Sequence, residues 1–398
     1  MHIGMILRST FPPDIRVRRE AKFLVNHGHK LTLFCTDEPN RTSTETIDGI
    51  NVIRVPTPQS PLAEIGELTY HASFVAPHWC QLVRKYISEF DVLHIHDLPM
   101  TRTGLLTARN IDVPVVVDFH EIYPDSVAAW RQSDTWLQRI RPYRLFKPVW
   151  RLHRYERRCV ENVDALLHES PEQQSYYREH NRISDIDTSV VRNVPDLDRL
   201  NDIVIDERTR DEFVVSYVGG FSPQRGLMTV VEAFSELLEI VTDAALLMVG
   251  DGSDTYVSQL KNRCADLGIS DNVEFTGWVE FDQVFSYLNE SDVSLCPWIG
   301  DNIDSECTLP NKLFQSMYMG VPVIVSDLKS MRTVVEETES GVVVDSESVS
   351  ELANALVELY RDPERCRELG ENGRQAVEDK YNFQHEGEQL VSLYERIQ

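Results

Sequence analysis

Short apolar runs alternate with segments of helical periodicity along the N-terminal half of the chain. The first run is HIGMIL (2–7), and the segment 16–26 then places its apolar residues on one helical face before Gly28. DVLHIH (91–96) and VPVVVDFH (113–120) are continuous apolar runs that end in polar residues, which is typical of buried parallel strands. This half therefore predicts strands that alternate with helices.

The same alternation starts again in the second half. EFVVSYVG (212–219) leads into a glycine-containing turn and a helical pattern over about 226–240. Further strand-like runs are AALLMVG (244–250), NVEFTG (272–277), DVSLCPW (292–298) and VPVIVSD (321–327). Two such series in tandem predict an α/β protein with two doubly wound domains that face each other across a cleft.

The length of 398 residues also favours two domains, because one hydrophobic core rarely grows to that size. We expect a first domain over 1–195 and a second over 196–375, divided within VVRNVPDLDRL (190–200). The helical segment 376–398 is expected to cross back to the first domain. In doubly wound sheets, ligands bind beyond the carboxyl ends of the strands.

Charge narrows the choice of partners. The chain carries 39 Lys and Arg against 64 Asp and Glu, a formal net charge of −25, which would repel a phosphate backbone. We therefore expect no nucleic acid partner. An acidic excess with few lysines is also typical of a halophilic protein.

Cysteine use and hydropathy indicate the compartment. The seven cysteines form no CxxC pair, so reduced thiols are favoured over zinc ligands or disulfides. The start of the chain does not read as a signal peptide, and no apolar stretch approaches the roughly 20 residues that span a bilayer. These features predict a cytoplasmic protein, peripheral to a membrane at most.

One segment departs from the acidic background. Residues 130–160 hold nine basic residues against Asp134 and Glu156, and tryptophans such as Trp130 and Trp150 lie among them. This mixture suits an anionic membrane surface or a phosphorylated acceptor. The alternative is an arginine-rich helix whose charges pair with acids of its own fold.

A glycine-rich turn follows the strand over 212–219. Gly219 and Gly220 would let backbone N–H groups approach a phosphate, and Arg225 would supply a cation near the start of the next helix. This pattern alone is common in α/β proteins. Together with Gly250 in LLMVGDGSD and the FTGWV turn (275–279), it predicts a binding surface suited to a diphosphate and a ribose.

A second polar cluster stands at the helix start in TLPNKLFQSMYMG. Lys312 is unfavourable there because a helix N-terminus repels a cation, and a bound diphosphate would offset that cost. Asn311 and Gln315, one turn apart, could hydrogen-bond a ribose or a base. The alternative is a solvated helix face.

The ordered set of motifs resembles a known family. It includes FPPDIRVRREA (11–21), DVLHIHD (91–97), VVVDFHEIYPD (115–125), VVRNVPD (190–196), RGL (225–227), MVGDGSD (248–254), EFTGWV (274–279) and TLPNKLFQSMYMG (308–320). The chain resembles the retaining glycosyltransferases of the GT4 family (glycosyl transferases group 1), which have the GT-B fold.

The resemblance implies a nucleotide diphosphate-sugar donor, a UDP- or GDP-sugar, bound by the second domain with no other cofactor and no metal. It implies catalytic roles for His120 beside the transferred sugar and for Arg225 and Lys312 on the donor phosphates. The other donor-binding residues that it implies are Gly219, Gly220, Gly250, Val279, Glu306, Leu309, Asn311 and Gln315. The residues expected on the acceptor side are Asp14, Arg16, His96 and Glu121.

The sequence departs from the family pattern at two places. Gly220 stands where a second basic residue is frequent, and Gln315 stands where the second of two glutamates is usual. The first glutamate position falls on Cys307, beside Glu306. We expect retaining transfer to a lipid-linked oligosaccharide or surface glycan precursor. The alternatives are a non-catalytic nucleotide-sugar-binding scaffold subunit and a sugar-nucleotide epimerase.

The histidines at the strand ends leave two interpretations. His94 and His96 share a strand face and His120 ends the next run, so a metal site is conceivable. A polar cluster beside a cleft is the favoured interpretation.

Overall fold

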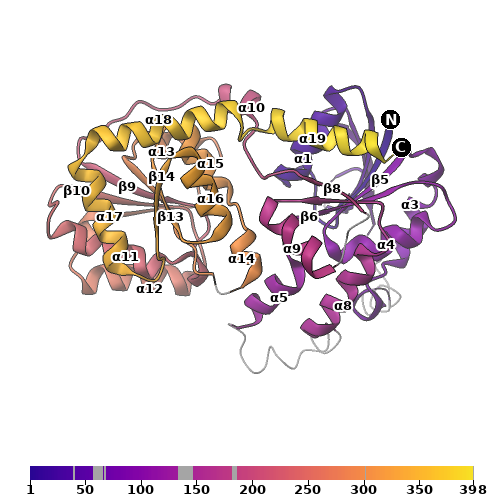
Figure 1. Ribbon diagram of the computed structural model, residues 1–398, viewed down its shortest axis with the longest axis horizontal. Coiled ribbons are helices and arrows are strands. Elements are labelled where there is room, and N and C mark those ends of the chain that lie inside the picture. Colours follow the sequence, from indigo (N-terminus) through magenta and orange to yellow (C-terminus); the bar gives the residue numbers. More distant parts are fainter. Residues whose placement is uncertain are drawn as a thin grey trace. The chain divides into compact units, whose positions relative to one another are not determined.

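The computed structural model describes residues 1–38, 41–56, 66, 69–132, 147–181, 186–300 and 302–397. They divide into two compact units (Figure 1). Unit 1 consists of Met1–Arg192, Asn302–Asp304 and Gln384–Gln398, and unit 2 of Asn193–Asp301 and Ser305–Phe383. The last helix, α19 (Phe383–Arg396), belongs almost wholly to unit 1, whereas α18 (Pro363–Asp379) belongs to unit 2.

Unit 1 is built on a sheet of eight strands among its described residues, in the order β3-β4-β2-β1-β5-β6-β7-β8. Its strands are β1 (His2–Ile6), β2 (Lys30–Thr36), β3 (Thr44–Ile47), β4 (Ile50–Val55), β5 (Val92–His96), β6 (Val115–Phe119), β7 (Ala165–His168) and β8 (Asp187–Val190). Neighbouring strands run parallel, except that β3 is antiparallel to β4. The apolar runs 2–7, 91–96 and 113–120 all became strands of this sheet.

The helices of unit 1 lie mostly between its strands in the chain. They are α1 (Ile15–Asn26), α3 (Pro77–Val83), η1 (Ile87–Glu89), α4 (Leu98–Ala108), α5 (Tyr123–Gln132), α8 (Val149–Val160), α9 (Pro171–Asn181) and α19. At the start of α1, the Asp14 carboxylate accepts a hydrogen bond from the Val17 N–H (3.1 Å). The first loop of the chain is thereby fixed beside the end of β1.

Unit 2 is a doubly wound parallel sheet in the order β11-β10-β9-β12-β13-β14. Its strands are β9 (Phe213–Val218), β10 (Ala244–Val249), β11 (Val273–Gly277), β12 (Val293–Cys296), β13 (Val323–Ser326) and β14 (Gly341–Val344). Its helices are α10 (Leu197–Asn201), η2 (Pro223–Arg225), α11 (Leu227–Leu238), α12 (Asp254–Asp266), η3 (Ser270–Asn272), α13 (Gln283–Asn289), α14 (Ile303–Cys307, which begins in unit 1), α15 (Asn311–Tyr318), α16 (Lys329–Thr338), α17 (Val349–Arg361) and α18.

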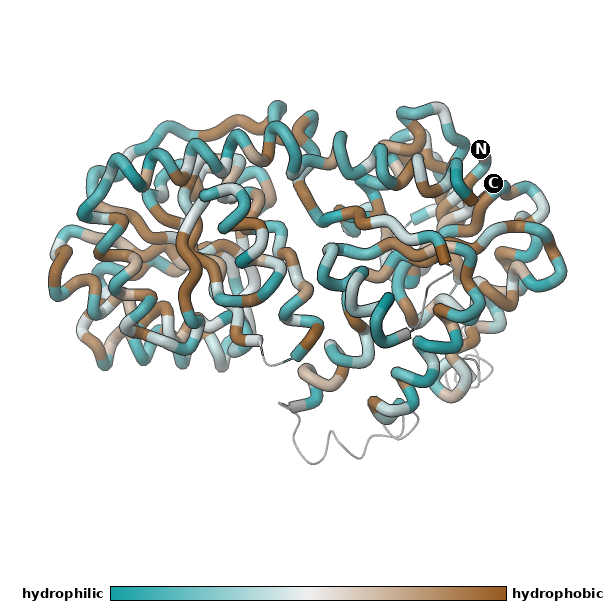
Figure 2. The backbone as a smooth tube through the Cα atoms, in the orientation of Figure 1, coloured by the Kyte–Doolittle hydropathy of each residue, from teal (hydrophilic) through white to brown (hydrophobic). Residues whose placement is uncertain are grey.

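The strands of unit 2 are apolar along most of their length (Figure 2) and are buried between helices. Val230, Phe234 and Leu237 of α11 pack with Leu356 of α17 in the core on one face of the sheet. Because the strands are covered on both faces, their continuous apolar runs are explained by burial. No helix in the described part of the chain is both long and apolar enough to cross a bilayer.

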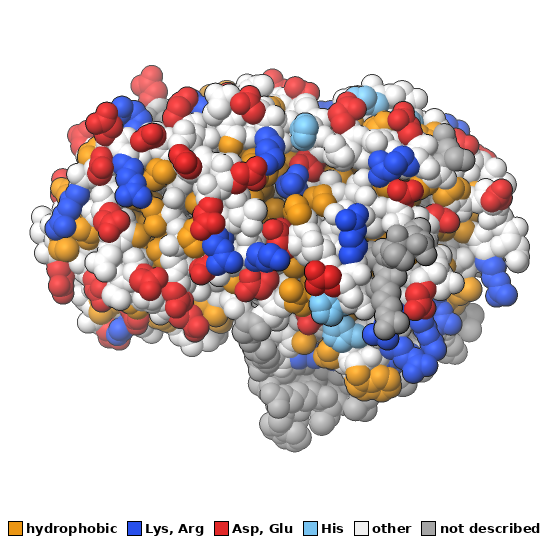
Figure 3. All heavy atoms as spheres, in the orientation of Figure 1, with side chains coloured by type: hydrophobic (Ala, Val, Ile, Leu, Met, Phe, Trp, Pro, Cys, Tyr) orange, Lys and Arg blue, Asp and Glu red, His pale blue; other side chains and the backbone are white. Residues whose placement is uncertain are grey.

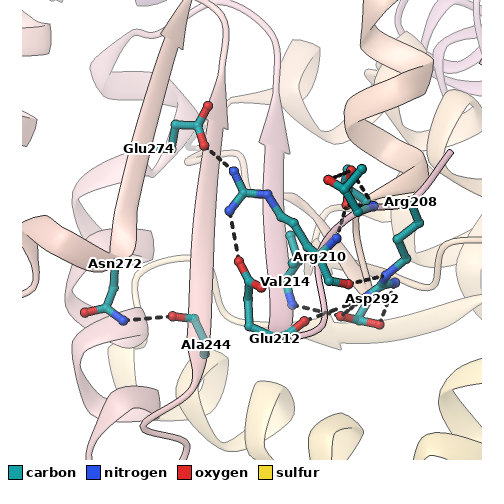
Figure 4. A network of polar contacts seen from close by, with 10 residues as sticks. Arg208, Arg210, Glu212, Val214, Ala244, Asn272, Glu274 and Asp292 are labelled. Atoms are coloured by element: carbon teal, nitrogen blue, oxygen red, sulfur yellow. Dashed lines mark hydrogen bonds and ion pairs between the residues drawn. The ribbon is translucent and has the colours of Figure 1, made fainter. Parts of the chain in front are cut away.

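The starts of the central strands of unit 2 are held by a polar network (Figure 4). Arg208 donates to both carboxylate oxygens of Asp292 (3.0 and 2.8 Å), and Asp292 also accepts from the Val214 N–H (2.8 Å). Arg210 donates to Glu212 (3.0 Å) and pairs with Glu274. This network lies at the amino ends of the strands, so it braces the sheet and leaves the carboxyl ends open for function.

Candidate functional site

In each unit the order of strands reverses beside the first strand. In unit 2, β10 and β12 lie on opposite sides of β9, and in unit 1, β2 and β5 lie on opposite sides of β1. The loops after these strands then diverge and leave a crevice at the carboxyl end of the sheet. The residues singled out in the sequence follow these strands.

At the carboxyl end of β9 and β10, two glycines bring backbone segments close together. Gly219 has φ +129° and Gly250 has φ +134°, conformations that side chains rarely adopt. A Cβ on Gly250 would lie 2.1 Å from the Gly219 carbonyl oxygen, and a Cβ on Gly219 would lie 3.0 Å from the Lys312 ammonium. Glycine at both positions therefore lets the Lys312 side chain pack against bare backbone.

Lys312 lies in the first turn of α15 with its ammonium buried. Its Nζ atom lies 3.5 Å from the centroid of the Tyr217 ring and has no hydrogen-bond partner among the described residues. Burial lowers the pKa of Lys312 to about 7. A buried ammonium beside a helix N-terminus is unfavourable until an anion accompanies it.

Arg225 supplies a second cation at the same end of the sheet. Its guanidinium lies 3.4 Å from the centroid of the Trp298 ring, which follows β12, and burial lowers its pKa. The charge of Arg225 opposes the charged form of Lys312, and no carboxylate of the described residues forms an ion pair with either cation. Their arrangement fits an anion with more than one charge.

The other predicted donor-side residues occupy varied positions in unit 2. The Glu306 carboxylate accepts from the Lys329 N–H (2.7 Å) at the start of α16, so one of its oxygens is engaged in the fold. The Gly220 carbonyl accepts from the Tyr217 hydroxyl (2.8 Å). Leu309 is buried, and Asn311 and Gln315 lie one turn apart on α15, the first exposed and the second half-buried. Val279 follows β11 and stands beside Trp278, whose side chain is 71% exposed.

In unit 1 the predicted acceptor-side residue Arg16 is buried rather than open to solvent. It donates from Nε and Nη2 to the two carboxylate oxygens of Asp118 (3.0 and 2.8 Å), and it also pairs with Glu20 (3.1 Å). Burial opposes the charged form of Asp118, but Arg16 and His120 outweigh it and hold the pKa of Asp118 well below its usual value. Arg16 and Asp118 thus form a buried ion pair that fixes the position of the Asp118 carboxylate.

His120 is held between two carboxylates. Its Nε2 lies 2.8 Å from Asp118 Oδ2, and its Nδ1 lies 3.4 Å from Asp97 Oδ1. Burial favours the neutral ring, but Asp97 and Asp118 prevail and raise the pKa of His120 to about 10. At neutral pH the ring is an imidazolium with both nitrogens protonated. It can therefore donate hydrogen bonds to the two carboxylates but cannot accept a proton.

The histidine pair on β5 lies deeper in unit 1. The rings of His94 and His96 stack with centroids 4.3 Å apart, and His94 Nδ1 lies 2.5 Å from the Tyr394 hydroxyl of α19. Side-chain atoms of Glu20, His94, His96 and Asp118 come within 4.8 Å of one another. Arg16 already pairs with both carboxylates of this group, and its charge opposes a metal ion there.

A pocket of about 630 Å³ opens at the reversal point of unit 1, between the loops after β1 and β5. Asp14 and His96 line it, as does Arg8, whose guanidinium lies 3.6 Å from the centroid of the Tyr70 ring. Lys147 lines it from the other side and lies 4.7 Å from the same ring. The pocket wall thus contains cationic side chains that lie over an aromatic ring.

The sequence had not assigned several pocket residues to the acceptor side, among them Arg8, Tyr70, Asp97 and Lys147. Asp97 and Arg8 each come directly after a strand, one or two residues beyond its end, and this position was the signal that could have found them. Tyr70 and Lys147 carry no such signal. Glu121, predicted for the acceptor side, has its pKa raised to about 8 by burial.

Asp97 has a strained backbone. Its φ of +69° and ψ of 147° lie close to a region that only glycine adopts readily, and such a conformation costs about 1–3 kcal/mol. The conformation is fixed by the Asp97 N–H, which donates to the Asp118 carbonyl (2.9 Å).

Sequence models of known families match most of the chain. The model described as "Glycosyl transferase 4-like domain" matches residues 13–193, and the model described as "Glycosyl transferases group 1" matches residues 212–362. The two matches fall on the two units of the structure.

Relatives and solved structures agree with these matches. The chain is 32% identical over 163 residues to the GDP-mannose-dependent alpha-(1-6)-phosphatidylinositol monomannoside mannosyltransferase of Mycobacterium tuberculosis, which covers 40% of the chain and 42% of that relative. The chain thus matches less than half the length of the first curated relatives. It is 22% identical to the phosphatidyl-myo-inositol mannosyltransferase of Mycolicibacterium smegmatis over 100% of the chain and 94% of that protein.

The fold is shared with the sucrose-phosphate synthase of Thermosynechococcus elongatus, with a TM-score of 0.78, 20% identity and coverage of 100% and 99%. Two parallel-sheet units and both family matches lead to one conclusion. The chain belongs to the glycosyl transferases group 1 family and has the GT-B fold.

Proposed function

We propose that the protein transfers a sugar, with retention of configuration, from a nucleotide diphosphate-sugar to an acceptor. The observation that carries this proposal is the pair of Lys312 and Arg225 at the reversal point of unit 2. A buried ammonium of pKa about 7 without a hydrogen-bond partner among the described residues needs an anion, and a diphosphate supplies one.

The same cations would act on the leaving group. As the bond from the sugar to the diphosphate breaks, its electron pair passes to the phosphate oxygen, where negative charge develops. Lys312, Arg225 and the Gly220 N–H group would stabilise this charge. The acceptor oxygen bonds to the anomeric carbon from the same face, and its proton passes to the departing phosphate. The His120 imidazolium, whose N–H groups face Asp118 and Asp97, would place a positive charge beside the transferred sugar.

For the donor we propose a GDP- or UDP-sugar, with GDP-mannose the first to test because the name of a relative includes it. We assign the ribose contact to Asn311 and Gln315, one turn apart on α15, and the base contact to the backbone at Val279. Gln315 can donate and accept hydrogen bonds but carries no charge, so its contact with the donor would be neutral.

For the acceptor we propose a lipid-linked glycan precursor that bears a phosphate. Arg8, Arg131 and Lys147 line the pocket of unit 1 and would bind the phosphate, while Tyr70 and Tyr123 offer flat apolar walls for a sugar ring. The names of the curated relatives, which include phosphatidylinositol acceptors, support this class.

We further propose that the protein attaches peripherally to an anionic membrane from the cytoplasmic side, through a surface formed by α4 and α8. Basic side chains gather over α8 (Figure 3). This α4–α8 surface holds a cavity of about 750 Å³ whose described lining includes no carboxylate. Its arginines are Arg102, Arg109, Arg151, Arg154 and Arg158, and they surround Trp150, which is 68% exposed.

The pairing of these arginines also supports membrane attachment. Arg102 donates to the backbone carbonyl of Ser73 (2.9 Å), a contact that does not neutralise its positive charge. Arginine beside exposed tryptophan suits the headgroup region of a bilayer. Residues 133–146 of the basic segment lie outside the described residues.

Lys312→Met tests the activity. A neutral side chain of similar shape removes the buried charge, so the variant is expected to melt at or above the wild-type temperature while kcat/KM falls about 100- to 1000-fold. Transfer is measured with a panel of GDP- and UDP-sugars on phosphatidylinositol and lipid-linked oligosaccharides. Lys261→Met, which removes another lysine that lies over a ring (Phe275), is the matched control and should keep wild-type rates. Wild-type rates in Lys312→Met, or donor binding without any transfer by the wild type, would contradict the proposal.

Binding of a nucleoside diphosphate is expected to depend on pH through Lys312. The free lysine, with pKa about 7, is mostly neutral at higher pH, and the diphosphate requires its charged form. Binding therefore takes up a proton, and the association constant should fall about tenfold per pH unit between about pH 7.5 and 9. Calorimetry in buffers of different ionisation enthalpy measures both effects. Lys312→Met should abolish them, and an affinity constant across this range in the wild type would refute the assignment.

The membrane surface is tested with Arg154→Glu/Arg158→Glu. Co-sedimentation with vesicles of phosphatidylglycerol and phosphatidylcholine should fall at least about tenfold. Each substitution removes a positive charge that the anionic surface attracts and adds a negative charge that it repels. Arg361→Glu/Arg367→Glu changes the net charge equally on unit 2 and should bind like the wild type. Equal losses in the two double variants would mean that net charge, not this surface, governs attachment.

A further inference from the structure

Asp97 stands at the start of α4 but does not cap it. At the starts of α1, α10 and α18, the side chains of Asp14, Asp196 and Asp362 accept hydrogen bonds from backbone N–H groups of the first turn. Asp97 makes no such bond, and its φ is +69°, whereas a capping residue ordinarily has an extended backbone. The usual reason for an aspartate at a helix start is therefore absent here.

Glycine would fit the Asp97 backbone without strain. Other positive-φ residues such as Asp48 and Asn110 lie in turns, next to Gly49 and at the end of α4, where aspartate and asparagine are common. Asp97 instead combines positive φ with an extended ψ of 147°. A strained conformation that persists in a non-glycine residue points to a role for its side chain.

The Asp97 carboxylate faces the pocket of unit 1. The residue lines that pocket, and its side chain is 42% exposed. One oxygen lies 3.4 Å from His120 Nδ1, and the other oxygen makes no hydrogen bond among the described residues. His96 lines the same pocket, is 1% exposed, and has no partner for its Nε2 in the described part of the chain. One oxygen of Asp97 and the Nε2 atom of His96 are thus two polar groups in the pocket wall that a ligand could contact.

Balancing the charge of His120 accounts for only part of Asp97. Asp118 also supplies a carboxylate to the imidazolium, 2.8 Å from Nε2, and Asp97 contacts Nδ1 through one oxygen, so its second oxygen is left for another partner. The longer contact to Asp97 instead fixes the direction of an exposed carboxylate.

We propose that Asp97 binds the acceptor: its carboxylate accepts a hydrogen bond from the hydroxyl group that attacks the sugar, and the His120 imidazolium holds the carboxylate in place. This inference rests on the proposed transfer and adds a residue that touches the acceptor. The ligand class at this end of the pocket is a polyol or sugar hydroxyl. The phosphate of the same acceptor would lie toward Arg8 and Lys147.

Asp97→Gly separates function from fold. The substitution relieves the strained backbone, so the melting temperature should equal or exceed that of the wild type, by about 2–4 °C at most. The loss of a hydrogen bond to a charged acceptor group should lower kcat/KM for the acceptor about 10- to 100-fold, mainly through KM. Affinity for GDP or UDP, measured by calorimetry, should stay at the wild-type value because the donor is bound by unit 2.

Two further variants complete the test. Asn110→Gly relieves a positive φ elsewhere in unit 1 and should keep both acceptor kinetics and stability near or above those of the wild type. Asp97→Asn keeps an oxygen that can accept a hydrogen bond but removes the charge. Its kcat/KM for the acceptor should lie between those of the wild type and Asp97→Gly. Wild-type acceptor kinetics in Asp97→Gly, with GDP-mannose and phosphatidylinositol or the substrates found active in the panel, would overturn the role of Asp97 alone. Absence of transfer by the wild type with every pair would instead overturn the proposed function, and this role with it.

Discussion

The reversal of strand order beside β1 and β9 is the constraint on which the rest of the structure depends. In a parallel sheet it opens a crevice at the carboxyl end, and several of the residues that carry chemistry here follow a strand at such a point. Gly219 follows β9 and Asp97 follows β5, and the N-terminal turn of α15 places Lys312 against Gly219. The amino ends are closed by ion pairs such as Arg208 with Asp292. In the sheet of unit 2, the ion pairs that stabilise the strands thus lie at one end and the candidate binding residues at the other.

The two crevices differ in electrostatic state. In unit 2, Lys312 and Arg225 are buried cations over the rings of Tyr217 and Trp298, and burial lowers the pKa of both. In unit 1, Arg16, Asp118 and His120 neutralise one another in a network with direct hydrogen bonds. A site that lacks an anion suits a charged ligand, whereas a compensated network suits the orientation of a neutral hydroxyl. This difference fits a donor in one unit and an acceptor in the other.

Much of the fold could be predicted from sequence because continuous apolar runs have few alternatives to buried strands, and the runs 91–96 and 244–250 became β5 and β10. Lys312 could be singled out because a cation opposes the helix dipole. The burial of Arg16 was not predictable, since its partner Asp118 is 102 residues away. The conformation of Asp97 was also hidden, because it is imposed by the bond to the Asp118 carbonyl and opposes the local preference of aspartate.

The central claim, that a nucleoside diphosphate binds at the carboxyl end of β9 and the start of α15, is tested most directly by hydrogen–deuterium exchange. Exchange is compared for the protein alone and with saturating GDP or UDP. Bound diphosphate should engage backbone N–H groups, so peptides over 219–227 and 309–315 should exchange more slowly, while peptides over the strand starts held by Arg208 and Asp292 should not change. Protection that spares both of these segments while the nucleotide is bound would contradict the account.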